Sequence, residues 1–237
     1  MSVLLEIAAN SFQSCLSAQQ GGADRIELFE NLAEGGCTPS YGMLALVKEK
    51  INIPVYVMIR PRGGDFIYSN DEFEIMNRDI VMCKQLGFTG IVFGMLDIQG
   101  GIDVARCKDL LSTCGDMKAT FHRAFDGSKD LHESMRKLID LGFDRVLTSG
   151  GEPNVEKGKE AIKKLQQEYG KDIVIMPGCG VTSVNARAIV DYCSVNEIHA
   201  TAKAKVSSTM QYSKLYFTDE WYESNTHEVE AIKRSLL

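Results

Sequence analysis

Short hydrophobic segments recur along the whole chain at a nearly regular spacing. Each is rich in branched residues and bounded by glycine or proline, which is typical of strands buried in a parallel sheet. They lie near residues 3–8, 24–29, 54–60, 90–95, 118–123, 144–149, 172–177 and 197–202. Successive segments begin about 21 to 36 residues apart, which leaves room for one strand, one crossover helix and two loops. Eight such units are the number that closes a (β/α)8 barrel.

The segments between these strands carry helix signals. Ser69 and Glu72 form a capping box before an apolar stripe, and Asp130 begins a second helix that Gly142 ends. A polar stretch at 203–227 precedes a final helix at 228–237. Since no Pro/Ser-rich linker divides the chain, we predict an α/β fold with a single TIM-barrel domain over residues 1–237. The alternative is a doubly wound open sheet, but residues 8–11 read Ala-Ala-Asn-Ser where its Gly-x-Gly-x-x-Gly turn would stand.

Composition excludes several classes of protein. A net charge of -6 disfavours a protein that coats nucleic-acid backbones. No segment approaches the ~18–20 apolar residues that span a bilayer, and the N-terminus lacks the basic region of a secretion signal. The seven cysteines are an odd number without a Cys-x-x-Cys pair, which is typical of a reducing compartment. We therefore expect a cytoplasmic protein with no nucleic-acid or membrane partner, and a homo-oligomer stays open.

Charged residues stand inside the hydrophobic strands, near the barrel end where active sites are built. Strand alternation predicts that five of them point inward: Glu6, Glu27, Arg60, His122 and His199. A charge in that position must be paired, neutralised or bound to a ligand, because burying it alone costs several kcal/mol. The alternative is a set of internal salt bridges, with His199 as an ordinary core residue.

Glu6 and Glu27 come from adjacent strands, whose backbones lie ~5 Å apart. If both side chains point inward, one of them should have a raised pKa unless Arg60 or another cation lies between them. Arg25 and Asp24 stand at the start of the second strand, on the end of a barrel that contributes stability. We therefore expect Arg25 and Asp24 to be structural.

The chemistry of these side chains predicts an acid–base site and an anion site. We assign general acid or base catalysis to Glu27 or His122 with Glu6 as a partner, and we add Asp126 from the loop after the fifth strand. The loop that starts at Arg60 has two arginines followed by Gly-Gly, which suits an anion. The predicted anion-binding residues are Arg60, Arg62, Asp65, Arg123, Ser149, Gly150, Gly178 and Gly180. The alternative for the glycine-rich turns is that they only let the chain bend.

Several longer motifs resemble the CutC family. They are Gly22-Ala23-Asp24-Arg25-Ile26-Glu27-Leu28, Glu34-Gly35-Gly36-Cys37-Thr38-Pro39-Ser40, Ile59-Arg60-Pro61-Arg62-Gly63-Gly64-Asp65-Phe66-Ile67-Tyr68 and Thr120-Phe121-His122-Arg123-Ala124-Phe125-Asp126. The resemblance extends from the first strand to about Tyr212. It implies a cytosolic TIM barrel that takes part in copper homeostasis and binds copper. Carried over by position, it implies a functional set of Glu6, Glu27, Arg60, Arg62, Asp65, His122, Arg123 and Asp126.

A copper(I) site would need two or three soft ligands close together. Only Cys37 and Cys179 fall on loops at the functional end, after strands two and seven, which are not neighbours. Where many relatives carry a cysteine after the second strand, this chain has Phe29. If a metal binds, the better ligand set is Glu6, Glu27, His122 and His199, which suits a divalent ion. Two hypotheses follow: a copper-handling protein, or an enzyme that acts on a small anionic metabolite, phosphorylated ones included.

Overall fold

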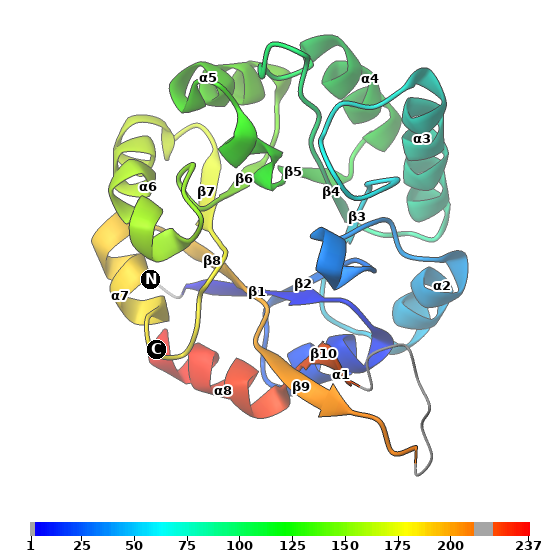
Figure 1. Ribbon diagram of the computed structural model, residues 1–237, viewed down its shortest axis with the longest axis vertical. Coiled ribbons are helices and arrows are strands. Elements are labelled where there is room, and N and C mark those ends of the chain that lie inside the picture. Colours follow the sequence, from blue (N-terminus) through cyan, green and yellow to red (C-terminus); the bar gives the residue numbers. More distant parts are fainter. Residues whose placement is uncertain (1–2, 211–219) are drawn as a thin grey trace.

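Eight parallel strands form a ring at the centre of the molecule (Figure 1). The computed structural model describes residues 3–210 and 220–237. The strands are β1 (Leu4–Ala9), β2 (Arg25–Leu28), β3 (Val55–Met58), β4 (Gly90–Phe93), β5 (Lys118–Phe121), β6 (Arg145–Thr148), β7 (Val174–Pro177) and β8 (Glu197–Ala200). Each strand lies inside its predicted range or within one residue of it. The predicted (β/α)8 barrel is therefore confirmed.

The order of the strands around the ring follows the order of the chain. Hydrogen bonds join the strands in the order β7-β6-β5-β4-β3-β2-β1-β8, and β7 also packs against β8, which nearly closes the ring. This order excludes the doubly wound sheet, in which strand order reverses at a switch point. Glu6 on β1 stands in register with Arg25 on β2 and with His199 on β8. These three side chains therefore start from the same level of the barrel.

Helices surround the ring of strands (Figure 1). They are α1 (Phe12–Gln20), α2 (Tyr41–Lys50), α3 (Asn70–Gln85), α4 (Val104–Cys114), α5 (Leu131–Leu141), α6 (Val155–Tyr169), α7 (Ala186–Cys193) and α8 (Thr226–Ser235), with short 3-10 turns η1 (Leu32–Glu34) and η2 (Arg123–Gly127). The capping box of Ser69 and Glu72 and the left-handed stop at Gly142 are both present, as predicted. No helix among the described residues is long and apolar enough to cross a membrane.

Apolar side chains pack in two separate layers. The larger layer lies between the strands and the helices. The smaller layer lies inside the ring and consists of Ala8, Phe29, Tyr56, Met58 and Val92. Barrel interiors are normally filled by branched apolar residues. Here this apolar cluster accounts for only part of the interior, and charged side chains occupy much of the rest.

A two-stranded hairpin stands beside the barrel (Figure 1). It pairs β9 (Lys203–Ser207) with β10 (Glu220–Ser224) in antiparallel fashion. The sequence predicted only a polar stretch here, because these strands are largely exposed and carry no buried apolar run. β10 lies on α1, where the Ser224 amide donates to Oγ of Ser14 at 3.0 Å.

Candidate functional site

Four charged side chains lie inside the barrel near the N-terminal ends of the strands, away from the mouth. Arg25 donates from Nε to Glu6 and from Nη2 to Glu197 at 2.5 Å. Arg145 binds the same Glu197 carboxylate through two nitrogens, at 2.7 and 3.0 Å. Both guanidinium groups lie over the ring of Tyr56. Two cations and two anions are therefore neutralised within one buried network.

Glu6 links this network to His199. Its side chain is fully buried, and its Oε1 lies 2.8 Å from Nδ1 of His199. Burial alone would raise the pKa of Glu6, but the charge of Arg25 and the hydrogen bond with His199 lower it to about 2. Glu6 is therefore ionised. With Nδ1 facing this carboxylate, Nε2 of His199 is left to face the barrel mouth.

Glu27 lies closer to the barrel mouth than Glu6 and has a different environment. Oε2 of Glu27 lies 3.7 Å from Nε2 of His199, and Oε1 is buried with no hydrogen-bond partner among the described residues. Burial raises the pKa of Glu27 to about 7, the charge of Glu6 adds to this rise, and His199 opposes it. The sequence predicted one raised pKa for two inward-facing glutamates. The cation that lowers the other is Arg25, not Arg60.

His122 is a neutral hydrogen-bond donor. Its Nδ1 accepts from the Ala124 amide at 3.1 Å, so the ring proton is on Nε2, which is buried without a partner. Burial, followed by the charge of Arg60, lowers the pKa of His122 to about 3. The Phe66 ring packs against the imidazole at a centroid distance of 4.9 Å. A Cβ at Gly94 would lie 2.6 Å from the ring, so only glycine leaves room for it there.

The guanidinium group of Arg60 binds backbone carbonyls of two loops, so its Nη donors are already used. Its Nη1 donates to the carbonyls of Glu34 and Gly36 at 2.7 and 2.8 Å, and its Nη2 donates to the carbonyl of Gly64 at 2.8 Å. The guanidinium also stacks on Phe66. The loop after β2 and the loop after β3 are held together by one buried side chain. Nε of Arg60 is buried and has no hydrogen-bond partner in the part of the chain that the structure describes.

Arg62 and Asp65 lie outside the cavity at the mouth. Arg62 donates to Glu72 at 2.6 Å and to the carbonyl of Ile67 at 2.7 Å. Asp65 pairs with Arg62 at 3.1 Å, and its side chain is 66% exposed. Both residues fix the loop that leads into α3. The geometry therefore gives Arg62 and Asp65 a local structural contact, where the sequence predicted contact with an anion.

Asp126 is the centre of a third loop network. Its carboxylate accepts from the amides of Ser149 and Gly151, from Thr148, and from Nε of Arg123 at 2.8 Å. Arg123 also donates from Nη2 to Ser149 at 2.8 Å, and its Nη1 makes no hydrogen bond to any residue that the structure describes. Asp126 and Ser149 therefore position Arg123. The catalytic role that the sequence predicted for Asp126 and the anion binding that it predicted for Ser149 stay predictions.

The glycine-rich turns differ from one another. The Gly150 amide donates to Thr148 at 2.8 Å, so it is already used within the protein. Gly178 packs against Leu147 and His199, where a Cβ would lie 2.4 Å from Leu147. Gly180 has a left-handed backbone with φ of 85° and lines the cavity.

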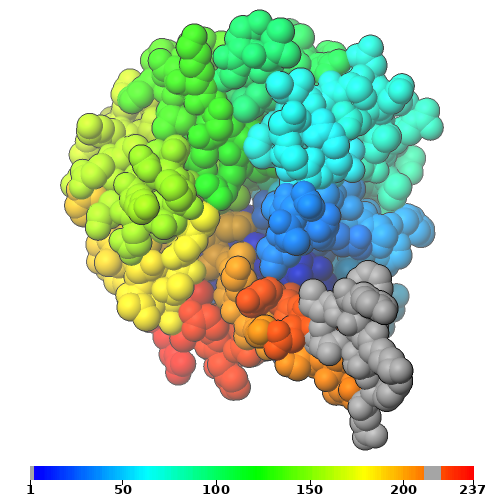
Figure 2. Space-filling view, in the orientation of Figure 1, coloured from blue at the N-terminus to red at the C-terminus, as the bar shows by residue number. Residues whose placement is uncertain are grey.

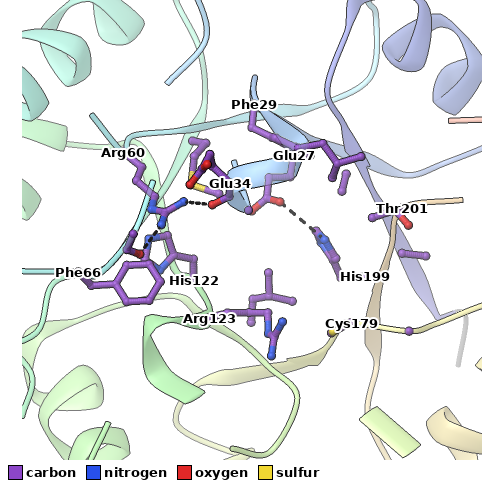
Figure 3. A pocket seen from close by; sticks show the side chains of 18 residues that line it. Glu27, Phe29, Glu34, Arg60, Phe66, His122, Arg123, Cys179, His199 and Thr201 are labelled. Atoms are coloured by element: carbon purple, nitrogen blue, oxygen red, sulfur yellow. Dashed lines mark hydrogen bonds and ion pairs between the residues drawn. The ribbon is translucent and has the colours of Figure 1, made fainter. Parts of the chain in front are cut away.

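A cavity of about 400 Å³ opens at the mouth of the barrel. Figure 2 shows this face hollowed near its centre. Figure 3 shows Glu27, His199, His122 and Arg123 around one open space. The lining residues are Ala8, Glu27, Phe29, Leu32, Glu34, Gly35, Met58, Arg60, Gly64, Phe66, His122, Arg123, Leu147, Cys179, Gly180, His199, Ala200 and Thr201. Of the predicted site, the structure brings together Glu27, Arg60, His122, Arg123, Cys179, Gly180 and His199.

The predicted metal ligands do not form one donor set. Both oxygens of Glu6 are occupied by Arg25 and His199, and Nδ1 of His122 by a backbone amide. Cys179 lines the cavity and Cys37 does not. In residues 3–210 and 220–237, no group of three or more His, Cys, Asp and Glu side chains is placed to hold a metal ion. The donors that are present therefore do not fit a copper(I) site with two thiolates.

Comparison with known proteins identifies the family. The model of the CutC family matches residues 3–204. The chain belongs to the CutC family. A relative from Chromobacterium violaceum, named family protein CutC, is 39% identical to this chain. The match covers 100% of this chain and 99% of the relative. The copper homeostasis protein cutC homolog of Homo sapiens is 44% identical over 88% of this chain and 77% of the human protein. The crystal structure of CutC from Streptococcus agalactiae has a TM-score of 0.80 at 34% identity, covering 84% of this chain and 98% of that one.

Sequence reasoning about this CutC-family chain missed three residues that shape the site. Arg145 and Glu197 were not singled out because each stands at the start of a strand, away from the mouth. Arg25 is structural, as expected, but it also sets the charge of Glu6. Glu34 lines the cavity from η1, and its carbonyl binds Arg60. A sequence signal did exist for Glu34, since it opens the Glu-Gly-Gly-Cys motif.

Proposed function

We propose that this CutC-family protein is an enzyme that moves a proton on a small anionic metabolite bound at the barrel mouth. One observation carries the proposal: the Glu27 side chain lines the cavity, its buried Oε1 has no hydrogen-bond partner among the residues that the structure describes, and the pKa of Glu27 is raised to about 7. A carboxyl group with this pKa is near the optimum for accepting and returning protons at neutral pH. Buried ionisable groups with shifted pKa values are typical of active sites.

The residues behind Glu27 support the same role. Arg25, Arg145, Glu6 and Glu197 balance each other in charge, so the pair of Glu27 and His199 faces the cavity without a net charge beneath it. Burial lowers the pKa of His199, but the charges of Glu27 and Glu6 together raise it above its usual value. Glu27 and His199 therefore influence each other's titration. Glu6 and Arg25 are positioning residues in this arrangement.

An anionic substituent of the metabolite would bind Arg123. This side chain lines the cavity, and its guanidinium is held by Asp126 and Ser149 in a fixed direction. Arginine offers several donors in a planar fork, which suits phosphate and carboxylate groups. The Nη donors of Arg60 bind loop carbonyls, so Arg60 contributes positive charge and holds the loops in place but does not bind the anion directly.

A ligand screen by thermal unfolding tests this function. We expect sugar phosphates or small carboxylates to raise the melting temperature, because a ligand at a hundred times its Kd adds about 2.7 kcal/mol to the free energy of unfolding. Arg123→Gln should abolish the shift, while Arg62→Gln, which alters an arginine outside the cavity, should keep it. Indifference of the wild-type protein to every phosphate and carboxylate would overturn the proposal.

A role in copper binding is the second candidate, supported by the name of the human relative and by Cys179 in the cavity. Copper(I) prefers several sulfur ligands, and one cavity thiol does not supply them. We therefore expect the protein to lose copper(I) to bicinchoninate in competition. Retention of one copper(I) per chain that Cys179→Ala abolishes and Cys37→Ala leaves intact would establish copper binding at the mouth instead. We also propose a cytosolic location, because all seven cysteines are free thiols.

A further inference from the structure

We infer that the substrate is a small carbonyl compound with an anionic group, that Glu27 removes a proton from the carbon next to the carbonyl, and that His122 donates a hydrogen bond to the carbonyl oxygen. This inference rests on the proposed function and names its substrate class. It rests on two buried atoms that have no hydrogen-bond partner within residues 3–210 and 220–237, Oε1 of Glu27 and Nε2 of His122. Both side chains line the same cavity, and Figure 3 shows them around the same open space.

The two atoms are chemically complementary to one kind of ligand. Oε1 of Glu27 accepts a hydrogen, whereas Nε2 of His122 donates one, because the Ala124 amide occupies Nδ1. A buried donor or acceptor without a partner costs about 1–3 kcal/mol, which a ligand that satisfies it recovers. An acidic C–H group beside a C=O group offers a hydrogen to one atom and an acceptor oxygen to the other. An alcohol lacks the acidic C–H group.

His122 is held as a fixed donor. The ring packs on Phe66, and Gly94 leaves it the space that a Cβ would take. A neutral imidazole stabilises negative charge that develops on an oxygen without first giving up a full proton. The fixed tautomer means that no reorganisation is needed when the charge appears. His122 therefore acts at the oxygen, and Glu27 acts at the carbon.

The proposed step balances without any further reactant. The C–H bond breaks, and its proton goes to Oε1 of Glu27. The electron pair of that bond forms a carbon–carbon double bond, and the π pair of the carbonyl moves onto oxygen, which accepts the hydrogen bond from Nε2 of His122. Once the Glu27 carboxyl has traded this proton for one from the solvent, protonation of the same carbon exchanges its hydrogen. In a hydroxycarbonyl compound, protonation of the former carbonyl carbon isomerises the compound, provided that the hydroxyl proton moves to the former carbonyl oxygen. Arg123 holds the anionic group at the cavity wall.

Hydrogen exchange in D₂O tests the inference with matched compounds. The probes are dihydroxyacetone phosphate with glycerol 3-phosphate as its alcohol counterpart, and pyruvate with lactate, so that phosphate and carboxylate are compared. We expect the protein to catalyse deuterium uptake, followed by proton NMR, at the carbon beside the carbonyl of at least one of the two carbonyl probes. Glu27→Gln should lower this rate at least about 100-fold while the probe still binds.

A second variant distinguishes loss of the His122 hydrogen-bond donor from a general loss of stability. In His122→Asn the shorter side chain can still accept from the Ala124 amide, since asparagine is a good cap, but it no longer presents the Nε2 donor. We expect exchange to fall roughly 100-fold, with a melting temperature that shows the variant folded.

The possible results test the proposed carbonyl chemistry separately from the proposed binding of an anionic metabolite. Exchange that depends on both Glu27 and His122 supports both. Binding of the phosphate or carboxylate probes through Arg123, without exchange and with equal affinity for ketone and alcohol, overturns the inference and leaves the anionic ligand site. If none of the four probes binds and no exchange occurs, the inference is overturned. The wider ligand screen then tests the proposed function. Exchange that survives in Glu27→Gln also overturns the inference.

Discussion

Glu6 and Glu27 show how one arginine separates the behaviour of two neighbouring glutamates. Both are buried, at 0% and 3% exposure, on adjacent strands. Arg25 pairs with Glu6 and lowers its pKa, whereas the ion-pair partner of Glu27 within residues 3–210 and 220–237 is His199 at 3.7 Å, and burial raises the pKa of Glu27. Like charges at close range favour this split. The site therefore contains one permanent anion and one carboxyl that changes its charge near neutral pH.

The raised pKa of Glu27 makes stability depend on pH. Between its ordinary value of 4.5 and about 7, the folded protein binds this proton more tightly than the unfolded chain, so stability falls as pH rises through this window. We expect Glu27→Gln to gain free energy of unfolding relative to the wild type between pH 5 and pH 8, by about 1–3 kcal/mol. Urea unfolding at a series of pH values measures this. Glu49→Gln, a change at an exposed carboxylate, should follow the wild type, and a pH-independent difference for Glu27→Gln would contradict the explanation.

Strand alternation predicted several, but not all, of the charged residues that point inward. Glu27, His122 and His199 were found in this way, because each interrupts a hydrophobic segment. Alternation says nothing about partners, however. Arg60 was predicted to bind an anion from its arginine-glycine loop, and its guanidinium instead binds three backbone carbonyls. Partners across the barrel depend on register and on loop paths, which a single sequence does not reveal.

At the scale of elements, Arg60 joins the loops that follow β2 and β3. A lysine at this position would keep the charge, but its single nitrogen cannot reach carbonyls on both loops in the same geometry. We expect Arg60→Lys to lower the free energy of unfolding by about 2–4 kcal/mol, because buried bonds from a charged donor are worth about 1.5–3 kcal/mol each. Arg62→Lys is the matched control in the same loop and should cost less than about 1 kcal/mol. Equal urea midpoints for the two variants would argue against this function of Arg60.

The hairpin of β9 and β10 was the one pair of strands that the sequence did not predict. β9 alternates between exposed and half-buried residues, β10 is exposed at its start and buried only at Ser224, and neither strand has a buried apolar residue. Their position depends on contacts with α1, such as the bond from the Ser224 amide to Ser14. Long-range contacts of this kind determine an element that local hydrophobicity does not mark.

At the scale of the whole molecule, the repeat of eight strand–helix units determines where the cysteines lie. Five of the seven are buried between strands and helices: Cys15, Cys83, Cys107, Cys114 and Cys193. Burial raises the pKa of each of these thiols, to about 12 for Cys15. Cys37 and Cys179 are partly exposed on loops at the mouth. The sequence predicted this division from helix spacing alone.

Thiol titration follows from this division. Because thiolate is the reactive form, we expect the native protein to react rapidly with Ellman's reagent at two thiols, and at all seven after unfolding in guanidinium chloride. Cys179→Ala should reduce the rapid phase to one thiol, and Cys15→Ala should leave it unchanged. Rapid reaction of more than two thiols in the native state would show that the barrel wall is more open than the structure indicates.

Carbon-13 NMR of the glutamate side-chain carboxyls follows the titration of Glu27 itself. We expect one carboxyl signal that titrates near pH 7 and disappears in Glu27→Gln, while the signal of Glu6 stays that of a carboxylate down to about pH 3. If every glutamate signal titrated below about pH 5, Glu27 would have an ordinary pKa and would be a permanent anion rather than a base with a raised pKa.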